Sequence, residues 1–206
     1  MSSGSETGDG LYAMVLAAGA ASRFGSAKQL VRVAGRPLLH NTVSRAVDVA
    51  GAATIVVLGA YATELAPLLR HTPATVVINR DWREGIGSSI RTGVGRLPAA
   101  CNGVMLMLAD QAAVTAEDLR RLVNAWKRQP DYVAAALYAS AVGVPAIFPR
   151  SRFSELAELR GDLGARKLLQ RNPDRLVRVP MESAALDIDT PEDLLALDAG
   201  QQNTRS

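Results

Sequence analysis

The stretch LYAMVLAAGAASRFGSAK, residues 11–28, decides how this chain folds. Residues 11–17 form an apolar run that ends at a glycine-containing stretch, a pattern that predicts a buried strand followed by a loop. Small residues crowd positions 17–22, so backbone N–H groups there can approach a ligand and cradle phosphate oxygens. Arg23 offers a planar fork for phosphate and Lys28 a mobile positive charge. The alternative is a small-residue turn that only packs a strand on a helix. The glycine spacing matches neither a P-loop nor a dinucleotide-binding loop.

The rest of the chain alternates between strand and helix patterns, which predicts an α/β fold with a mostly parallel central sheet flanked by helices. We expect one domain over residues 11–198, with a disordered leader at 1–10 and a frayed tail at 199–206. Ligands of such sheets bind beyond the carboxyl ends of the strands. Strands are expected at 53–58, 75–78, 103–108, 132–137, 146–148 and 175–179, and helices at 37–49, 63–70, 87–97, 115–127, 151–159, 162–170 and 190–197.

Composition narrows the class of protein. The chain has 206 residues, a formal net charge of +3 and one cysteine, Cys101, so no intrachain disulfide can form. A single cysteine fits a reducing compartment, and we expect a cytoplasmic protein. The sequence contains no run rich in Lys and Arg and no apolar run of about 18 residues, which argues against nucleic acid and membrane as partners.

Two acidic segments are candidate metal sites. Asp110 follows the uncharged strand predicted at 103–108, and a carboxylate buried there needs a partner charge, which magnesium would supply. Helix capping is the alternative, but Thr115 lies nearer the next helix start. In the segment LDIDTPEDL, residues 186–194, alternation places Asp187 and Asp189 on one side, although pure helix capping is equally reasonable there.

Three further segments carry polar groups beside glycines. Residues 79–93 place Ser88 and Ser89 at a predicted helix start, where they form either an anion or base-edge site or an ordinary cap. Residues 143–148 and 161–166 contain glycines that permit close approach, and Arg166 could bind a second anion. A turn and a helix start capped by Asp162 is the simpler interpretation of residues 161–166.

Taken together, these segments resemble the signature motifs of the molybdenum cofactor nucleotidyltransferases over about residues 15–195, and more narrowly the cytidylyltransferase branch. The resemblance implies a Rossmann-like nucleotidyltransferase fold and a loop that wraps a nucleoside triphosphate. It implies catalytic roles for Arg23, Lys28 and Asp110, and a Mg²⁺ ion held by Asp110 and Asp189. It implies nucleotide contacts from Leu16, Ala17, Ala18, Gly19, Ser22, Arg23, Lys28, Asn79, Ser88, Ser89 and Asp110, and acceptor contacts from Gln111, Pro145, Gly161, Asp162 and Arg166.

The activity implied is transfer of CMP from CTP to the terminal phosphate of molybdopterin, with release of pyrophosphate. Ala18-Gly19 is the pair that goes with cytidine in this family, and a molybdenum hydroxylase would receive the product. Val144 stands where the family often has His, which leaves another phosphorylated acceptor open. A non-catalytic carrier of the molybdenum cofactor is the alternative from another class.

Overall fold

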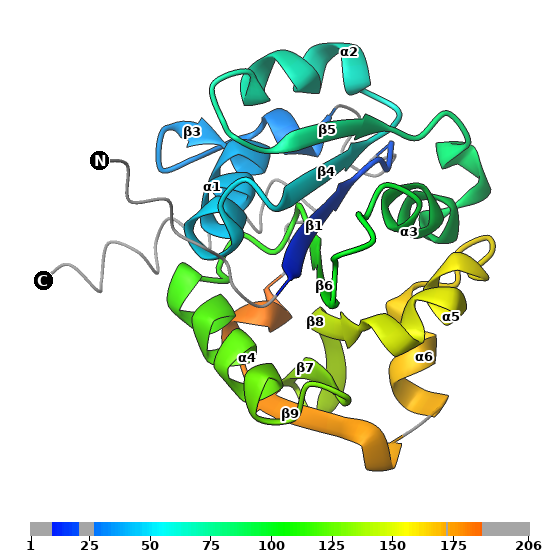
Figure 1. The fold of residues 1–206 in the computed structure, drawn as a ribbon. Helices are drawn as coiled ribbons and strands as arrows, with labels where there is room; N and C mark the ends of the chain where they lie inside the picture. Colours follow the sequence, from blue (N-terminus) through cyan, green and yellow to red (C-terminus); the bar gives the residue numbers. More distant parts are fainter. Residues whose placement is uncertain (1–9, 21–26, 172, 187–206) are drawn as a thin grey trace, which may run out of the picture.

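One mixed sheet forms the centre of the protein, in a computed structural model that describes residues 10–20, 27–171 and 173–186. The strand order is β5-β4-β1-β6-β8-β7-β9 (Figure 1). Strand β8 runs antiparallel to both of its neighbours, and the other paired strands run parallel to each other. The strands are β1 (Leu11–Ala17), β4 (Thr54–Leu58), β5 (Thr75–Ile78), β6 (Gly103–Leu108), β7 (Val133–Tyr138), β8 (Ala141–Pro149) and β9 (Leu176–Pro180).

Helices cover both faces of the sheet (Figure 1). The α-helices are α1 (Leu38–Ala50), α2 (Ala62–Leu65), α3 (Ile86–Val94), α4 (Ala116–Arg128), α5 (Phe153–Ala157) and α6 (Ala165–Arg171). Helices α1 and α4 lie on one face, and α3, α5 and α6 on the other. Strand β1 shows why both faces must be covered. Ala13 and Val15 pack in the hydrophobic core on the side of α1 and α4, whereas Met14 and Leu16 pack in the core on the side of α3, α5 and α6.

Short 3-10 turns and a small hairpin connect these elements. The turns are η1 (Lys28–Leu30), η2 (Ala66–Leu69), η3 (Trp82–Glu84), η4 (Arg150–Arg152), η5 (Pro173–Arg175) and η6 (Glu182–Ala185), and the hairpin strands are β2 (Arg32–Val33) and β3 (Arg36–Pro37). We did not predict this hairpin; its turn uses Ala34 and Gly35 at positive φ.

Helix α4 shows how local sequence fixes an element. The Thr115 hydroxyl accepts a hydrogen bond from the backbone N–H of Asp118, and the Asp118 carboxylate accepts one from the backbone N–H of Thr115. This reciprocal capping box satisfies donors that the helix leaves unpaired. The predicted cap at Thr115 is confirmed, which removes the capping explanation for Asp110.

The predicted fold class is confirmed, and several elements need correction. The helix expected at 151–159 divides into η4 and the short α5, which ends at Ala157, and the helix expected at 87–97 ends at Val94. The helix expected at 63–70 divides into α2 and η2, because Pro67 has no N–H to continue the α-helical pattern. The helix expected at 162–170 begins only at Ala165. The short strand expected at 146–148 extends over 141–149 and pairs with β7 as a hairpin. The helix at 190–197, residues 1–9 of the leader and the tail lie outside the described residues, and the single domain over 11–198 stays a prediction.

Among the helices of the described part of the chain, none combines the length and apolar character needed to cross a membrane.

Candidate active site

The carboxyl ends of β1 and β6 meet at the centre of one sheet edge. Leu16 pairs with Leu108 in the ladder, and the backbone N–H of Ala109 donates to the Leu16 carbonyl over 3.2 Å. The buried Thr42 hydroxyl of α1 donates to the Ala109 carbonyl over 3.1 Å. This pairing brings the loop after β1 next to Asp110, as the rule for parallel sheets predicts.

The start of the small-residue loop is held by neighbouring backbone. The Ala18 carbonyl accepts from the N–H of Ala60, and the Gly19 carbonyl accepts from the Gln29 side-chain amide. A Cβ at Gly59 would lie 2.6 Å from the Ala18 oxygen, so only glycine fits against this loop. Gly19, in contrast, has no heavy atom of the described residues within 4 Å of its missing Cβ, so on this side its backbone is open to an approaching ligand.

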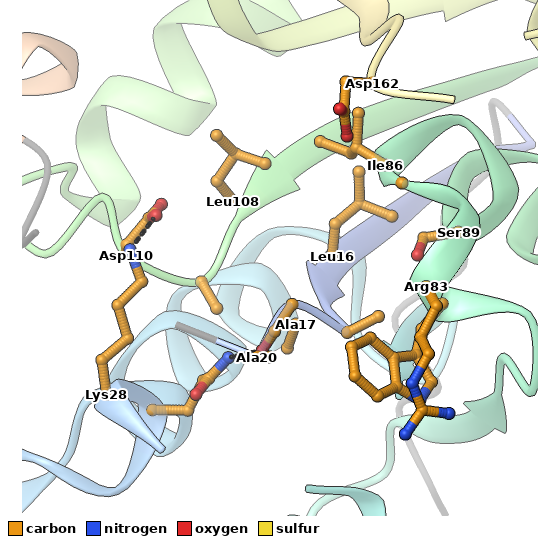
Figure 2. Close-up of a pocket in the computed structure, with 16 residues that line it drawn as sticks. Leu16, Ala17, Ala20, Lys28, Arg83, Ile86, Ser89, Leu108, Asp110 and Asp162 are labelled. Carbon is orange, nitrogen blue, oxygen red and sulfur yellow. Dashed lines mark hydrogen bonds and ion pairs between the residues drawn. The ribbon is translucent and has the colours of Figure 1, made fainter. Parts of the chain in front are cut away.

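An ion pair joins the loop to the end of β6. Lys28 begins η1, and its Nζ donates to Asp110 Oδ2 over 2.7 Å (Figure 2). The two side chains are 15% and 20% exposed, so the pair is largely removed from water. The second carboxylate oxygen, Asp110 Oδ1, is buried and has no hydrogen-bond partner among the described residues. A buried acceptor in that state is suited to a cation that is not part of the chain.

A cavity of about 430 Å³ opens beside this pair, a volume typical of small-molecule sites. Figure 2 shows Lys28 and Asp110 at one end, Ser89 and Arg83 at the other, and Leu16 between them. The lining comprises Leu16, Ala17, Ala18, Gly19, Ala20, Lys28, Gln29, Trp82, Arg83, Gly85, Ile86, Ser89, Leu108, Ala109, Asp110 and Asp162.

The wall opposite the ion pair comes from η3 and the start of α3. The Arg83 guanidinium lies over the Trp82 ring, 4.4 Å from its centroid, and both residues line the cavity. The Cβ of Trp82 also packs close to Gly59 and therefore close to the loop after β1. Neither Trp82 nor Arg83 was among the predicted site residues; an aromatic and a cationic residue shortly before the glycines at 85 and 87 were the signal available.

Asn79 and Ser88 lie behind this wall, outside the cavity lining. The Asn79 amide donates to the hydroxyls of Ser88 and Ser89 over 2.8 and 3.0 Å, and its carbonyl oxygen accepts from the N–H of Asp81. Ser88 donates to the carbonyls of Asp81 and Gly85. The structure thus places Asn79 and Ser88 as buried supports, and Ser89 is the member of this group that lines the cavity.

The residues predicted to bind the acceptor are not gathered in one place. Asp162 lines the cavity, Arg166 is exposed on α6, and Gly161 lies against the start of α3. Gln111 is 3% exposed, and its amide nitrogen donates to the carbonyls of Val144 and Ala184. Gln111 therefore ties β8 and η6 to the end of β6. Pro145 belongs to β8 and is absent from the residues that line the cavity.

Ser22, Arg23 and Asp189 lie outside the described residues, so half of the expected phosphate-binding set and the second expected metal ligand are untested. Within the residues that the structure describes, no group of three His, Cys, Asp or Glu side chains gathers as a metal site. Of the two predicted metal ligands, Asp110 is the one that lies within the described residues.

Comparison with known proteins assigns the chain to the nucleotidyltransferases, enzymes of this Rossmann-like fold that take a nucleoside triphosphate as substrate. A family model described as "MobA-like NTP transferase domain" matches residues 13–176, which is most of the chain, and the chain belongs to that family.

Several proteins outside the molybdenum cofactor pathway by name are similar to this chain in sequence and fold. The chain is 28% identical to nicotine blue oxidoreductase of Paenarthrobacter nicotinovorans over 89% of this chain and 94% of that protein. It is also 28% identical to a crystal structure of the Mycobacterium tuberculosis Rv0371c homologue from Mycobacterium sp. strain JC1, with a TM-score of 0.82 and coverage of 95% and 98%. The structure of Rv0371c from Mycobacterium tuberculosis H37Rv in complex with manganese gives 28% identity, a TM-score of 0.76 and coverage of 92% and 98%.

Proposed function

We propose that this nucleotidyltransferase transfers CMP from CTP to the terminal phosphate of molybdopterin, forming molybdopterin cytosine dinucleotide and releasing pyrophosphate. The observation that carries the proposal is the Lys28–Asp110 pair at the mouth of the small-residue loop, with Asp110 Oδ1 buried and unpaired in the described part of the chain. A cation and an available carboxylate beside open backbone are what binding of a metal–triphosphate complex requires. The resemblance of the motifs to the cytidylyltransferase branch supports the choice of nucleotide and acceptor.

The chain's own groups supply positioning and charge. An oxygen of the acceptor phosphate attacks the α-phosphorus of CTP; the new P–O bond forms as the bond from the α-phosphorus to the bridging oxygen breaks, and pyrophosphate leaves with that electron pair. No covalent enzyme intermediate is needed. Lys28 donates hydrogen bonds to phosphate oxygens and offsets their charge as pyrophosphate departs. By resemblance, Arg23 does the same from the part of the loop outside the described residues.

A divalent ion fits this site on the evidence of Asp110 Oδ1, a buried oxygen that lacks a partner in the described part of the chain. We propose Mg²⁺ held by Asp110, with Asp189 as a second ligand by resemblance. A bound Mg²⁺ ion would neutralise charge on the triphosphate oxygens. The manganese complex of the Rv0371c protein supports a divalent ion in this family.

Ala18 is proposed to favour a pyrimidine. The residue is 5% exposed and its methyl group packs against Gly59, so the methyl group cannot move away from a larger base. At the far wall, Ser89 and the stacked Trp82–Arg83 pair line the cavity, and we propose that they contact base or ribose. An indole face covered by a guanidinium is a planar, rigid surface suited to a flat ligand.

The test is pyrophosphate release from CTP, GTP and ATP with Mg²⁺, measured with and without molybdopterin. Release from CTP that depends on molybdopterin supports the proposal. Nucleotide turnover with a sugar or polyol phosphate but not with molybdopterin would show that the enzyme uses another acceptor. Binding of CTP and molybdopterin without pyrophosphate release would indicate a carrier that delivers cofactor to a molybdenum hydroxylase. Because one relative is named an oxidoreductase, turnover needs this direct measurement.

We also propose a cytoplasmic location for the enzyme. Cys101 is fully buried, and burial raises the pKa of its thiol to about 11, which keeps it protonated and unreactive at neutral pH. A protein with a single, inert cysteine needs no oxidising compartment.

A further inference from the structure

We propose that Glu84 and Arg91 are positioning residues that join the nucleotide wall to the acceptor segment, so that nucleotide binding orders the acceptor segment. Here the nucleotide wall means residues 82–91 and the acceptor segment means residues 159–164. This inference rests on the proposed function, because it assigns the two segments to the two substrates of one transfer reaction.

A clamp of charged groups connects the two segments. The Arg91 guanidinium donates to both carboxylate oxygens of Glu84, with 2.8 Å between Nη1 and Oε1, and also to the carbonyl of Leu159. The same Oε1 atom of Glu84 accepts from the backbone N–H of Gly161 over 3.3 Å. Each side chain therefore touches both its partner and the acceptor segment. Bidentate pairing of this kind fixes orientation as well as distance.

Direct backbone contact reinforces the clamp. The N–H of Gly87 donates to the Gly161 carbonyl over 2.9 Å. A Cβ at Gly85 would lie 2.5 Å from the backbone of Gly161, and one at Gly87 would lie 2.9 Å from the N atom of Arg160. These glycines are required because the acceptor segment lies directly on them. The two backbones cannot separate without loss of these contacts.

Both segments reach the same cavity, which gives the clamp a functional consequence. Ile86 and Ser89 of the nucleotide wall and Asp162 of the acceptor segment all line it, and Figure 2 shows Asp162 beside Ile86. A nucleotide that immobilises the wall also immobilises whatever the wall holds. The second substrate then binds a segment that is already ordered, so less conformational entropy is lost on its binding. This is positive coupling between the two sites.

The clamp keeps its charge over a wide pH range. The hydrogen bond from Arg91 lowers the pKa of Glu84 to about 2, and the pair with Glu84 raises the pKa of Arg91. The acidic and basic groups that face the pair are Asp81 and Arg160. Changes of pH between 5 and 9 therefore leave the clamp intact, so coupling that changed sharply in this range would need another cause.

Deuterium exchange of the full-length protein tests the coupling. The probe is the magnesium complex of whichever of CTP, GTP or ATP binds, so a wrong choice of base does not decide the result. In the wild type we expect nucleotide to slow exchange of amides 159–164 by about tenfold, within the range of ordinary coupling. In Glu84→Gln and Arg91→Met we expect this protection to fall at least threefold, while nucleotide affinity changes by less than that.

Two comparisons separate coupling from simple loss of stability. Arg91→Lys keeps the charge and should restore part of the protection. Glu155→Gln, on α5, is the matched control: it removes a 2.8 Å ion pair with Arg152 of η4, and its side chain is 33% exposed against 36% for Glu84. The control should keep full protection. Wild-type nucleotide binding without protection of 159–164, or protection unchanged in Glu84→Gln and Arg91→Met, would overturn the inference and leave the proposed nucleotide site standing.

Discussion

Lys28 Nζ and Asp110 Oδ2 lie 2.7 Å apart, so the lysine expected to hold phosphate is paired with the carboxylate expected to hold metal. Both side chains are more than three-quarters buried, where opposite charges attract strongly. Binding of a metal–triphosphate complex would exchange this contact for two others: Lys28 to phosphate and Asp110 to the cation. The pair keeps both charges satisfied until then.

Replacement of Lys28 by Met should separate these two roles. Without the ammonium group, a metal ion no longer competes with Lys28 for the Asp110 carboxylate. We therefore expect affinity for Mn²⁺ alone, measured by electron paramagnetic resonance, to rise severalfold. Affinity for CTP should fall about tenfold or more, since a charge-assisted contact to phosphate contributes roughly 1.5–3 kcal/mol. Lys167→Met, on the exposed face of α6, is the control and should change neither. A fall in Mn²⁺ affinity would show that Lys28 does not compete for Asp110.

Asp110→Asn should abolish catalysis while the protein stays folded. The amide keeps the shape of the carboxylate but cannot supply the negative charge that a divalent ion requires. We expect pyrophosphate release to fall by a factor of about 100 or more, with a stability loss of about 1–3 kcal/mol from the weakened contact to Lys28. Urea unfolding and the pyrophosphate assay measure the two effects. Asp48→Asn, at an exposed position of α1, should leave both unchanged, and a turnover close to wild type in Asp110→Asn would remove Asp110 from the site.

Ser88 and Ser89 are neighbours with opposite expected effects. Ser88 donates to two backbone carbonyls and accepts from Asn79, so Ser88→Ala should cost about 1–3 kcal/mol of unfolding free energy. Ser89 lines the cavity, so Ser89→Ala should weaken nucleotide binding severalfold with a smaller loss of stability. Calorimetric titration with CTP and urea unfolding provide the two readouts. If both variants lost only stability, the far wall would not contact the nucleotide.

Sequence patterns predicted the centre of the sheet well because β1, β4 and β6 are buried on both faces and read as continuous apolar runs. The bounds of β1, β5 and β6 were predicted correctly, as was the cap of α4 at Thr115. Asp110 could also be found, since a carboxylate directly after an uncharged central strand has few structural explanations.

The wall opposite Asp110 could not be predicted in the same way. Asn79 and Ser88 have the residue types of ligand contacts, but their polar atoms are used by Asp81, Gly85 and each other. These hydrogen bonds depend on how α3 packs against β5 and η3, which no periodicity encodes. The Gln111 amide similarly donates to backbone carbonyls of β8 and η6, two segments distant from Gln111 in the sequence. Local patterns specify elements, whereas these partners depend on tertiary packing.

Two glycines of the loop region should respond differently to the same added methyl group. Gly59→Ala would place a Cβ 2.7 Å from the Trp82 Cβ and 2.8 Å from the Ala18 Cβ, so we expect a loss of stability of about 1–3 kcal/mol together with weaker nucleotide binding. Gly19→Ala meets no atom of the described residues within 4 Å and should leave the melting temperature unchanged, yet weaken CTP binding where phosphate approaches the backbone. Equal affinity for CTP in Gly19→Ala and the wild type would place the phosphates elsewhere.

Asp118 should make stability depend on pH in the acid range. Burial alone would raise the pKa of this carboxyl, but hydrogen bonds from Thr115, Arg121 and Ser183 outweigh it, and the pKa is lowered. A lowered pKa in the folded state means that the contribution to stability is complete above the unfolded value of about 3.9 and is lost as the pH falls below it. Asp118 also fixes the position of η6, because Ser183 donates to its Oδ2 over 2.8 Å.

The difference in unfolding free energy between the wild type and Asp118→Asn isolates this effect, since other titrating groups contribute equally to both proteins. We expect a difference of about 1–3 kcal/mol at pH 7 that shrinks steadily between pH 4 and pH 2.5, measured by urea unfolding. Glu117→Gln is the matched control on the same helix turn: its carboxylate is 72% exposed and lies 3.6 Å from Arg120, so its effect should be close to zero at every pH. A difference for Asp118→Asn that stayed constant from pH 7 to pH 2.5 would mean that the charge of Asp118 does not stabilise the junction of α4 and η6, and that shape alone holds it.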